Sequence, residues 1–351
     1  MKLSVATGIY QRRGDSSVHR ELGEVLTVLR SIGYDTFDLS LASLDQPNFI
    51  LLGDRWERKV EEVGDTAAKL GITFAQSHLP FVPGCSMRTC PEFQRPEYAE
   101  FFFECTRRAY LASRMLGIPW TVLHPLTFPE YNYETRASLD GNHTCYDQYI
   151  DLGLRLGVGT AIENMPPSMD RKLGTVYCQH YEQLIELVDS FADPQVGICW
   201  DTGHGNLMGL RQSRALRAMG KRLKVLHIND NHAGFRDEHV LPYMGDIDWD
   251  DVVQGLTDIG YDGALNYETG NVSANAYGTL QIEYVKMAYR SGQFLRACLK
   301  SSNEDGNEGK RENLSRNIKF AFTIFPKSAE FVEPAEKTLY HPAAWQNDKL
   351  V

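Results

Sequence analysis

The sequence lacks the features that mark several classes of protein. It has no run of about 18 apolar residues, so no membrane-spanning helix is expected, and near Met1 the polar stretch Gln11–Asp15 takes the place of a signal peptide's apolar core. Its seven cysteines include no C-x-x-C pair, which argues against a zinc knot or a redox motif. Basic residues are in deficit, 36 against 46 Asp and Glu, and the formal net charge of −10 argues against binding nucleic acid through bulk positive charge. We therefore expect a cytoplasmic protein with buried free thiols.

Eight short apolar runs recur along the chain, separated by longer segments with helical periodicity. The runs predict strands at Leu3–Ala6, Thr36–Leu39, Ile72–Ala75, Thr121–Leu123, Thr160–Ile162, Val196–Cys199, Lys224–Ile228 and Ala264–Tyr267. The segments between them predict helices that include Arg20–Ser31, Glu57–Leu70, Tyr98–Leu116, Tyr146–Leu156, His180–Ser190 and Trp249–Ile259. Several of these helices are followed by a glycine just before the next strand, where a helix C-cap belongs: Gly33, Gly71, Gly117, Gly157 and Gly260.

Repeated strand–helix units fit either a closed (β/α)₈ barrel or a doubly wound open sheet. No G-x-G-x-x-G or G-x-x-x-x-G-K-[ST] motif follows the first strand, so the phosphate-binding loop of open nucleotide-binding sheets is missing. Polar and ionisable residues end nearly every strand from the third to the eighth, and a barrel mouth brings such ends to one point. The sequence thus predicts an α/β fold, a (β/α)₈ TIM barrel over residues 1–300. Residues 301–351 are expected to form a linker and a C-terminal extension, which carries the apolar run Ile318–Phe325.

Four ionisable residues at the ends of consecutive strands form a predicted metal site. Such side chains are costly to bury unless they are paired or bind a metal. If the barrel closes, Glu163, Asp201 and Glu268 meet in one cup, where a divalent cation would offset their repulsion and His227 would add a nitrogen ligand. Three carboxylates and one imidazole suit Mn²⁺, Co²⁺, Mg²⁺ or Zn²⁺. A strand-end carboxylate taken alone is more typical of a salt bridge at the rim of the barrel, but that explanation does not account for the whole set.

Several segments of the chain resemble those of one superfamily of barrels. They are A-I-E-N-M-P around Glu163, W-D-T-G-H around Asp201 and His204, L-H-I-N-D around His227, N-Y-E-T-G around Glu268, and residues 237–249, which follow a D-x-H…G-x-I-D-[WF] pattern. In this order they resemble the xylose isomerase-like TIM barrel superfamily, which contains sugar phosphate isomerases and epimerases, with endonuclease IV as a cousin. The resemblance extends from Met1 to about Lys300.

The resemblance implies a metal-dependent isomerase or epimerase that transfers a proton next to the carbonyl group of a sugar or sugar phosphate. Glu163 and Glu268 would serve as acid and base around a divalent metal ion, Mn²⁺ by preference, held by Glu163, Asp201, His227 and Glu268. The expected substrate contacts are His78, His124, His204, Arg236, Asp237 and His239. The partner is then a small-molecule sugar, and residues 301–351 would contact a second copy or another subunit.

Two alternatives remain open at this point. Endonuclease IV-like proteins bind three zinc ions, and each corresponding position here holds a suitable residue: His78, His124, Glu163, Asp201, His204, His227, Asp237, His239 and Glu268. This favours a multi-zinc phosphodiesterase, although the segments E-N-M-P-P-S-M-D and W-D-T-G-H-G-N-L-M-G depart from the patterns of that branch. The other alternative is a non-catalytic metal-binding barrel in a larger complex, since an apolar run after a finished barrel often meets a partner.

Overall fold

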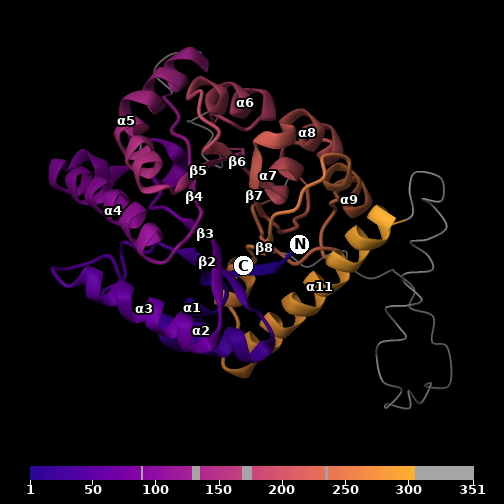
Figure 1. The fold of residues 1–351 in the computed structure, drawn as a ribbon, viewed down its shortest axis with the longest axis horizontal. Coiled ribbons are helices and arrows are strands. Elements are labelled where there is room, and N and C mark those ends of the chain that lie inside the picture. Colours follow the sequence, from indigo (N-terminus) through magenta and orange to yellow (C-terminus); the bar gives the residue numbers. More distant parts are fainter. Residues whose placement is uncertain (88–89, 129–134, 168–175, 234–235, 305–351) are drawn as a thin grey trace, which may run out of the picture. The chain divides into compact units, whose positions relative to one another are not determined.

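The computed structural model describes residues 1–87, 90–128, 135–167, 176–233 and 236–304. In these residues eight strands alternate with helices, and each strand is parallel to its neighbours (Figure 1). The eight predicted strands are confirmed, with ends that differ by at most a few residues: β1 (Leu3–Ala6), β2 (Thr36–Ser40), β3 (Thr73–His78), β4 (Trp120–Leu123), β5 (Gly159–Glu163), β6 (Val196–Asp201), β7 (Leu223–His227) and β8 (Leu265–Tyr267).

The strands form a barrel and not an open sheet. Their order is β7-β6-β5-β4-β3-β2-β1-β8, so β8 lies beside β1. The two end strands of this order, β7 and β8, are joined by a parallel bridge between Ile228 and Tyr267. Around it, the N–H of Ile228 donates to Asn266 O at 2.7 Å and the N–H of Glu268 donates to Ile228 O at 3.0 Å. The predicted TIM barrel is therefore confirmed.

Helices surround the barrel, and the predicted ones are present: α2 (Leu22–Ile32), α3 (Trp56–Leu70), α4 (Pro96–Met115), α5 (Thr135–Leu156), α6 (Tyr181–Ser190) and α9 (Trp249–Asp258). The predicted start of α5, at Tyr146, is wrong because the polar first half of this helix has no strong apolar periodicity. Gly141 lies in that half, where a Cβ atom would overlap the ring of Phe128. All five glycines that were expected at helix ends have a positive φ.

Further helices complete the ring or shape the mouth. They are α1 (Gly8–Gln11), α7 (Thr202–Leu207), α8 (Gln212–Met219), α10 (Gly270–Ala274) and α11 (Thr279–Glu304), with short 3₁₀ turns at Pro83–Cys85, Pro91–Gln94 and Gly220–Arg222. Helix α11 is still helical through residue 304, although the sequence predicts a linker from 301. Residues 305–351 lie outside the described residues, so their proposed contact with a second subunit stays a prediction.

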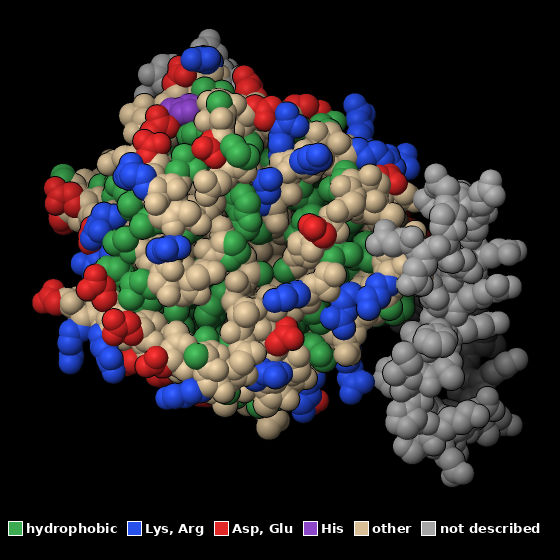
Figure 2. All heavy atoms as spheres, viewed as in Figure 1, with side chains coloured by type: hydrophobic (Ala, Val, Ile, Leu, Met, Phe, Trp, Pro, Cys, Tyr) green, Lys and Arg blue, Asp and Glu red, His purple; other side chains and the backbone are tan. Residues whose placement is uncertain are grey.

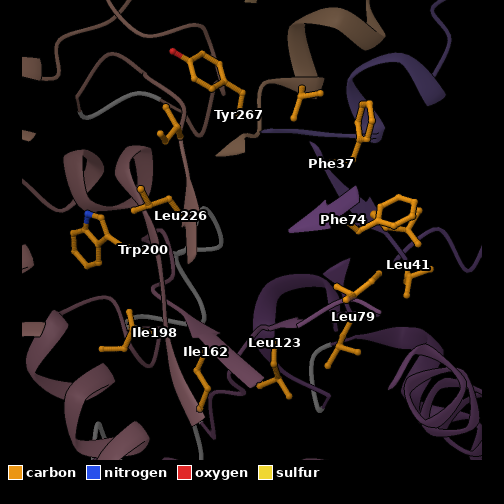
Figure 3. Packing of buried hydrophobic residues seen from close by; sticks show 14 of the residues in the cluster. Phe37, Leu41, Phe74, Leu79, Leu123, Ile162, Ile198, Trp200, Leu226 and Tyr267 are labelled. Atoms are coloured by element: carbon orange, nitrogen blue, oxygen red, sulfur yellow. The ribbon is translucent and has the colours of Figure 1, made fainter. Parts of the chain in front are cut away.

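The core between the strands and the helices is built from one face of each strand. Phe37, Leu123, Ile162, Trp200 and Leu226 belong to a single large cluster of buried side chains, and Figure 3 shows them arranged around the strands. Because side chains alternate along a strand, the residue after each of these points into the barrel. A small second cluster fills the barrel interior: Val122, Ala161, Cys199 and Val225, with Trp120 packed against it.

The outer surface of the barrel carries charges of both signs. Figure 2 shows acidic and basic side chains interspersed over the face in view, with hydrophobic side chains between them. Among the described helices none combines the length and the apolar composition that crossing a bilayer requires. The free cysteines are buried or partly buried, as expected.

Two glycines make room for the side chains at the amino-terminal end of the barrel. A Cβ atom on Gly159 would overlap the ring of Trp120, and one on Gly197 would overlap the side chain of Lys224 and lie 2.9 Å from the backbone oxygen of Arg222. The Lys224 ammonium lies 5.6 Å from the centre of the Trp120 ring, within the range of a cation–π contact. The side chains of Trp120 and Lys224 therefore occupy space at the amino-terminal end of the barrel that a side chain at either glycine would take.

We expect Gly197→Ala to lower the free energy of unfolding by about 1–3 kcal/mol. The added Cβ atom would overlap the backbone oxygen of Arg222, which cannot move away by a change of side-chain rotamer. Gly23→Ala is the matched control. Gly23 lies in α2 with a negative φ, and a Cβ atom added there would have no other atom within 4 Å, so alanine should stabilise the protein by about 0.4–1 kcal/mol. Urea denaturation of the two variants measures both changes, and equal stability of the two would contradict the overlap at Gly197.

Candidate functional site

The ionisable residues that end strands β5 to β8 meet in the mouth of the barrel. Glu163, Asp201 and His227 are the last residues of β5, β6 and β7, and Glu268 directly follows β8. One ligand atom from each lies within 4.8 Å of the others. We call these four residues the quartet. Each comes directly after an outward-facing apolar residue of its strand, which explains why all four point inward: Ile162, Trp200, Leu226 and Tyr267.

His227 lies between the two glutamates of the quartet. Its Nδ1 atom is 2.9 Å from Glu163 Oε1 and 3.1 Å from Glu268 Oε2. The side chain of Glu163 is 1% exposed, whereas that of Glu268 is 27% exposed. Burial would raise the pKa of Glu163, but the imidazoles of His227 and His124 outweigh burial and hold this pKa well below its usual range. Glu163 is therefore an ionised carboxylate.

Two histidines from neighbouring strands extend the quartet on the side of Glu163. His78 ends β3, His124 directly follows β4, and their Nε2 atoms are 3.1 Å apart. The Nδ1–H of His78 donates to Leu79 O at 2.8 Å, so the Nε2 lone pair of a neutral His78 faces the mouth. Glu163 Oε2 lies 3.1 Å from His124 Nε2 and 3.6 Å from His78 Nε2. The two imidazoles and this carboxylate form a second set of potential metal ligands.

A third set lies on the side of α7 and of the loop after β7. Asp237 Oδ2 is 3.3 Å from His204 Nε2 and 3.0 Å from His239 Nε2. Both imidazoles donate their Nδ1–H to a backbone carbonyl at 2.7 Å, His204 to Asn164 O and His239 to Glu268 O. Two such imidazoles can contact one carboxylate favourably only if they are also protonated at Nε2 or share a cation with it.

In the metal-free protein protonation satisfies this third set. Burial would lower the pKa of His239, but the Asp237 carboxylate outweighs burial and raises this pKa to about 10. Burial likewise opposes the protonation of His204, whose pKa Asp201 and Asp237 raise well above its usual value. Burial raises the pKa of Asp201 to about 6, against the opposing charge of His204. A divalent cation would take the place of these protons.

The donor atoms fit a divalent metal ion. Glu163 Oε2 and Asp237 Oδ1 are buried oxygens that accept no hydrogen bond of good geometry in the described part of the chain, so each has lone-pair capacity for a cation. Cys199 lies beside Glu163 and His227, but burial raises the pKa of its thiol, which therefore stays protonated. Oxygen and imidazole ligands without a thiolate suit Mn²⁺, Co²⁺, Mg²⁺ or Zn²⁺. The buried clusters of His, Glu and Asp are thus consistent with a metal site.

Amide side chains hold Asp201 in place, and none of them was singled out from the sequence. Asp201 Oδ1 accepts the N–H of His204 at 2.7 Å as the N-cap of α7, and Oδ2 accepts from Asn229 Nδ2 at 2.6 Å. Asn164 bonds both to the N–H and to the carbonyl of Asp201, at 2.7 and 3.0 Å. Gly203 leaves space for Asn229, because a Cβ atom there would overlap its side chain. These roles depend on β5, β6 and β7 being neighbours.

Two members of the quartet, Glu163 and Glu268, line a cavity of about 630 Å³. Five of the six predicted substrate contacts lie in its wall: His78, His124, His204, Asp237 and His239. The sixth, Arg236, is exposed and is not among the lining residues of this cavity. The structure therefore gathers the histidines and Asp237 around one space and leaves Arg236 outside it.

The cavity wall also contains residues that the sequence did not single out for the site. Asp38 of β2 is 1% exposed and lines the cavity. Phe81 stacks on His124, with ring centres 4.7 Å apart and planes at 28°. Apolar side chains such as Val82 and Met165 continue this wall. The signal for Asp38 was present, since a carboxylate interrupts the otherwise apolar predicted strand Thr36–Leu39.

Comparison with known proteins relates this architecture to one family. A family model described as xylose isomerase-like TIM barrel matches residues 26–298. The uncharacterized protein MJ1311 of Methanocaldococcus jannaschii is 31% identical over 173 residues, which are 48% of this chain and 57% of that protein. D-psicose 3-epimerase of Enterocloster bolteae is 32% identical over 87 residues, 25% of this chain and 27% of the enzyme. The matched regions thus span less than two thirds of either relative.

Solved structures share the fold over most of the chain. A D-tagatose 3-epimerase-like protein superposes with a TM-score of 0.65 at 20% identity, covering 87% of this chain and 99% of that one. L-ribulose 3-epimerase gives a TM-score of 0.63 at 15% identity, with 88% and 100% covered. The IolI protein with a bound zinc atom gives 0.62 at 16% identity, with 87% and 100% covered. At these identities the likeness establishes the fold.

The third set predicts how the stability of the metal-free protein depends on pH. The pKa of His239 is about 10 in the folded protein and about 6.5 in the unfolded chain, so its stabilisation is complete below pH 6.5 and is lost as the pH rises towards 10. We expect the Tm measured in a chelator to fall over this range, and the fall to be shallower in His239→Gln.

His180→Gln is the control, since His180 is exposed and lies outside the three sets. Its Tm should show the pH dependence of the unaltered chain. With Mn²⁺ present, the fall in the Tm of the unaltered chain with rising pH should become smaller or reverse, because metal binding displaces the same protons. A metal-free Tm that is constant or rises between pH 6.5 and 10 would contradict the protonated arrangement.

Proposed function

We propose that this chain, which belongs to the xylose isomerase-like TIM barrel family, is a divalent-metal-dependent isomerase or epimerase that transfers a proton next to the carbonyl group of a sugar or sugar phosphate. The observation that carries the proposal is the quartet: three carboxylates and one imidazole offer ligand atoms within 4.8 Å of one another, and Glu163 and Glu268 among them line the cavity. Sugar 3-epimerases among the relatives and structural neighbours support the substrate class.

The quartet would hold the metal ion, with Mn²⁺ preferred. When bound, a divalent ion supplies a Lewis acid that polarises a carbonyl group and stabilises negative charge developing on the adjacent oxygens. The carboxylates of Glu163, Asp201 and Glu268 offer oxygen ligands, and His227 offers Nδ1, which already faces both glutamates. Asn164 and Asn229 would keep Asp201 in its orientation through their hydrogen bonds.

Glu163 and Glu268 would move the proton. Glu163 is ionised, and Glu268 is the more accessible of the two from the cavity. A carboxylate that reaches a C–H bond next to a carbonyl can take its proton, and a second carboxylate can return a proton to the other face or to the neighbouring carbon. Because both groups converge on His227, a substrate carbon bound over the quartet would lie within reach of each.

The cavity wall would orient the sugar. His78, His124, His204, Asp237 and His239 offer donors and acceptors for hydroxyl groups. Phe81 presents an apolar ring, 37% exposed, against which the C–H face of a sugar can pack. Arg236 could contact the substrate, as predicted, only if the substrate extends out of the cavity described above.

Exchange of deuterium from solvent tests the proton transfer directly. We expect the Mn²⁺-loaded protein to incorporate deuterium from D₂O into at least one member of a panel of ketoses and ketose phosphates, measured by mass spectrometry. Glu163→Gln and Glu268→Gln should each lower the exchange rate by roughly 10²–10⁴-fold, because a neutral amide cannot accept the proton.

Glu104→Gln is the matched control, because Glu104 pairs with Arg107 and Arg108 on α4, away from the cavity. Its exchange rate should equal that of the unaltered chain. The proposal would be overturned if exchange persists in both glutamine variants. It would also be overturned if the chain binds metal at the quartet but exchanges deuterium into none of the ketoses.

A second candidate function is hydrolysis of phosphodiesters with several metal ions. It is favoured by the two further sets of ligands, His78 and His124 around Glu163, and His204 and His239 around Asp237. Sites with several adjacent metal ions suit in-line displacement at phosphate. In this function Glu163 would be shared between two ions, and the third set would hold a separate one.

The number of bound metal ions separates the two functions. Elemental analysis of the purified chain after reconstitution should give one ion of the Mn²⁺ type per chain if proton transfer is correct. Three zinc ions per chain, together with hydrolysis of bis(p-nitrophenyl) phosphate, would contradict the proton-transfer function and support the hydrolase. In that case His204→Gln combined with His239→Gln should remove one ion, whereas a one-ion chain should be unchanged in metal content.

A further inference from the structure

A carboxylate on β2 faces the side of His227 that points away from the quartet. Asp38 Oδ2 lies 3.5 Å from His227 Nε2, and the two side chains are 2% and 0% exposed. His227 Nδ1 faces Glu163 and Glu268, so the imidazole is placed between carboxylates on both edges. Asp38 is thus the nearest described acidic group to the nitrogen of His227 that the quartet does not use.

Three neighbouring side chains fix the orientation of Asp38. Its Oδ2 atom accepts from Gln76 Nε2 at 3.1 Å and from Asn266 Nδ2 at 3.0 Å. Asn266 is in turn held by Ser4, whose hydroxyl donates to Asn266 Oδ1 at 2.9 Å. All four residues are buried, at 1% exposure or less. A chain of polar contacts from β1, β8 and β3 therefore holds this carboxylate inside the barrel.

A bulge between β2 and β3 produces this arrangement. Phe37 pairs with Phe74, but the next pair is Asp38 with Gln76, so Ala75 is the extra residue on β3. Without the bulge, the alternation along β3 would place Gln76 on the same outward face as Phe74. The bulge brings the amide of Gln76 opposite Asp38, where their hydrogen bond forms. Bulges that re-aim a side chain are common beside active sites.

We propose that Asp38 is a positioning residue that acts through His227. Its carboxylate accepts the hydrogen of Nε2–H and so fixes the tautomer and ring orientation in which the Nδ1 lone pair faces the quartet. The inference rests on the proposed metal site, and it assigns Asp38 a role that the quartet alone does not need. Carboxylates behind a ligating histidine tune metal affinity by about 10–100-fold in other metal sites.

Contacts within the structure favour this role over a structural one. Asp38 Oδ1 and His227 Nε2 are both buried and have no hydrogen-bond partner elsewhere in the described residues. A small closure of the 3.5 Å separation, or a turn of the carboxylate that brings Oδ1 forward, therefore gives Nε2 its acceptor. The ring of His78 stacks on that of His227, with centres 5.6 Å apart and planes at 13°, and limits tilting out of plane. Asp38 would restrict rotation within the plane from the Nε2 edge, as Glu163 and Glu268 do from the Nδ1 edge.

Titration of the chelator-treated chain with Mn²⁺ alone, followed by calorimetry, tests the proposal without any sugar. We expect Asp38→Asn and Asp38→Ala to weaken Mn²⁺ binding by about 10–100-fold, the alanine variant more, because the amide oxygen can still accept a hydrogen bond. Asp251→Asn is the matched control. Asp251 is a partly buried carboxylate on α9 that accepts from Ser213 and Arg211, so its loss should leave the affinity unchanged.

The tautomer of His227 provides a readout that a purely structural role would not move. Imidazole ¹H–¹⁵N correlation spectra of the Zn²⁺-loaded chain, assigned with His227→Gln, should show the Nε2–H form, and Asp38→Asn should shift this signal. Thermal unfolding of the metal-free Asp38→Asn variant checks that it folds. Unaltered Mn²⁺ affinity and spectrum in a folded Asp38→Asn variant would overturn the inference, whereas failure of the unaltered chain to bind Mn²⁺ would overturn the proposed function itself.

Discussion

Repulsion between carboxylates brought together by barrel closure is the constraint on which the rest of the site depends. Two unit charges about 4.8 Å apart repel by roughly 3 kcal/mol at an effective dielectric constant of about 20, and Glu163, Asp201 and Glu268 all lie within that separation of one another. Histidines surround them, and in the metal-free protein the raised pKa values of His204, His227 and His239 allow protonation of these three rings to offset the repulsion. A divalent ion could take the place of these protons, so the three carboxylates can be neutralised either by protonated histidines or by a bound metal ion.

Backbone carbonyls decide which nitrogen faces the mouth in three of its histidines. Leu79 O, Asn164 O and Glu268 O occupy one ring nitrogen of His78, His204 and His239 respectively, which leaves Nε2 for the cavity in every case. His227 is the exception, because it presents Nδ1 to the quartet and its Nε2 meets a carboxylate in place of a carbonyl. This difference is the basis of the positioning role proposed for Asp38.

Much of the fold and of the quartet could be predicted because both follow from local patterns. Apolar runs mark strands, and an ionisable residue after an outward apolar one, as in Ile162–Glu163, marks a side chain that points inward. The start of α5 was predicted too late because its first turns are mostly polar, with Leu139 the one large apolar side chain before Tyr146. Asp38 and Asn229 were missed because their roles come from partners on other strands, and in the case of Asp38 from a one-residue bulge in β3. Arg236, expected as a substrate contact, directly precedes the matched segment 237–249, and it is exposed and absent from the cavity lining.

The charge of the cavity wall bears on the choice between the two candidate chemistries. Its described lining contains four carboxylates and a single cationic side chain that is always charged, Arg12. A phosphodiester, itself an anion, would enter such a cavity more favourably once bound metal ions had offset the charge of these carboxylates. A neutral sugar has no such requirement, because one ion over the quartet suffices and the apolar wall around Phe81 suits its C–H face. The arrangement of fixed charges therefore favours a neutral sugar over an anionic substrate, whether a phosphodiester or a sugar phosphate.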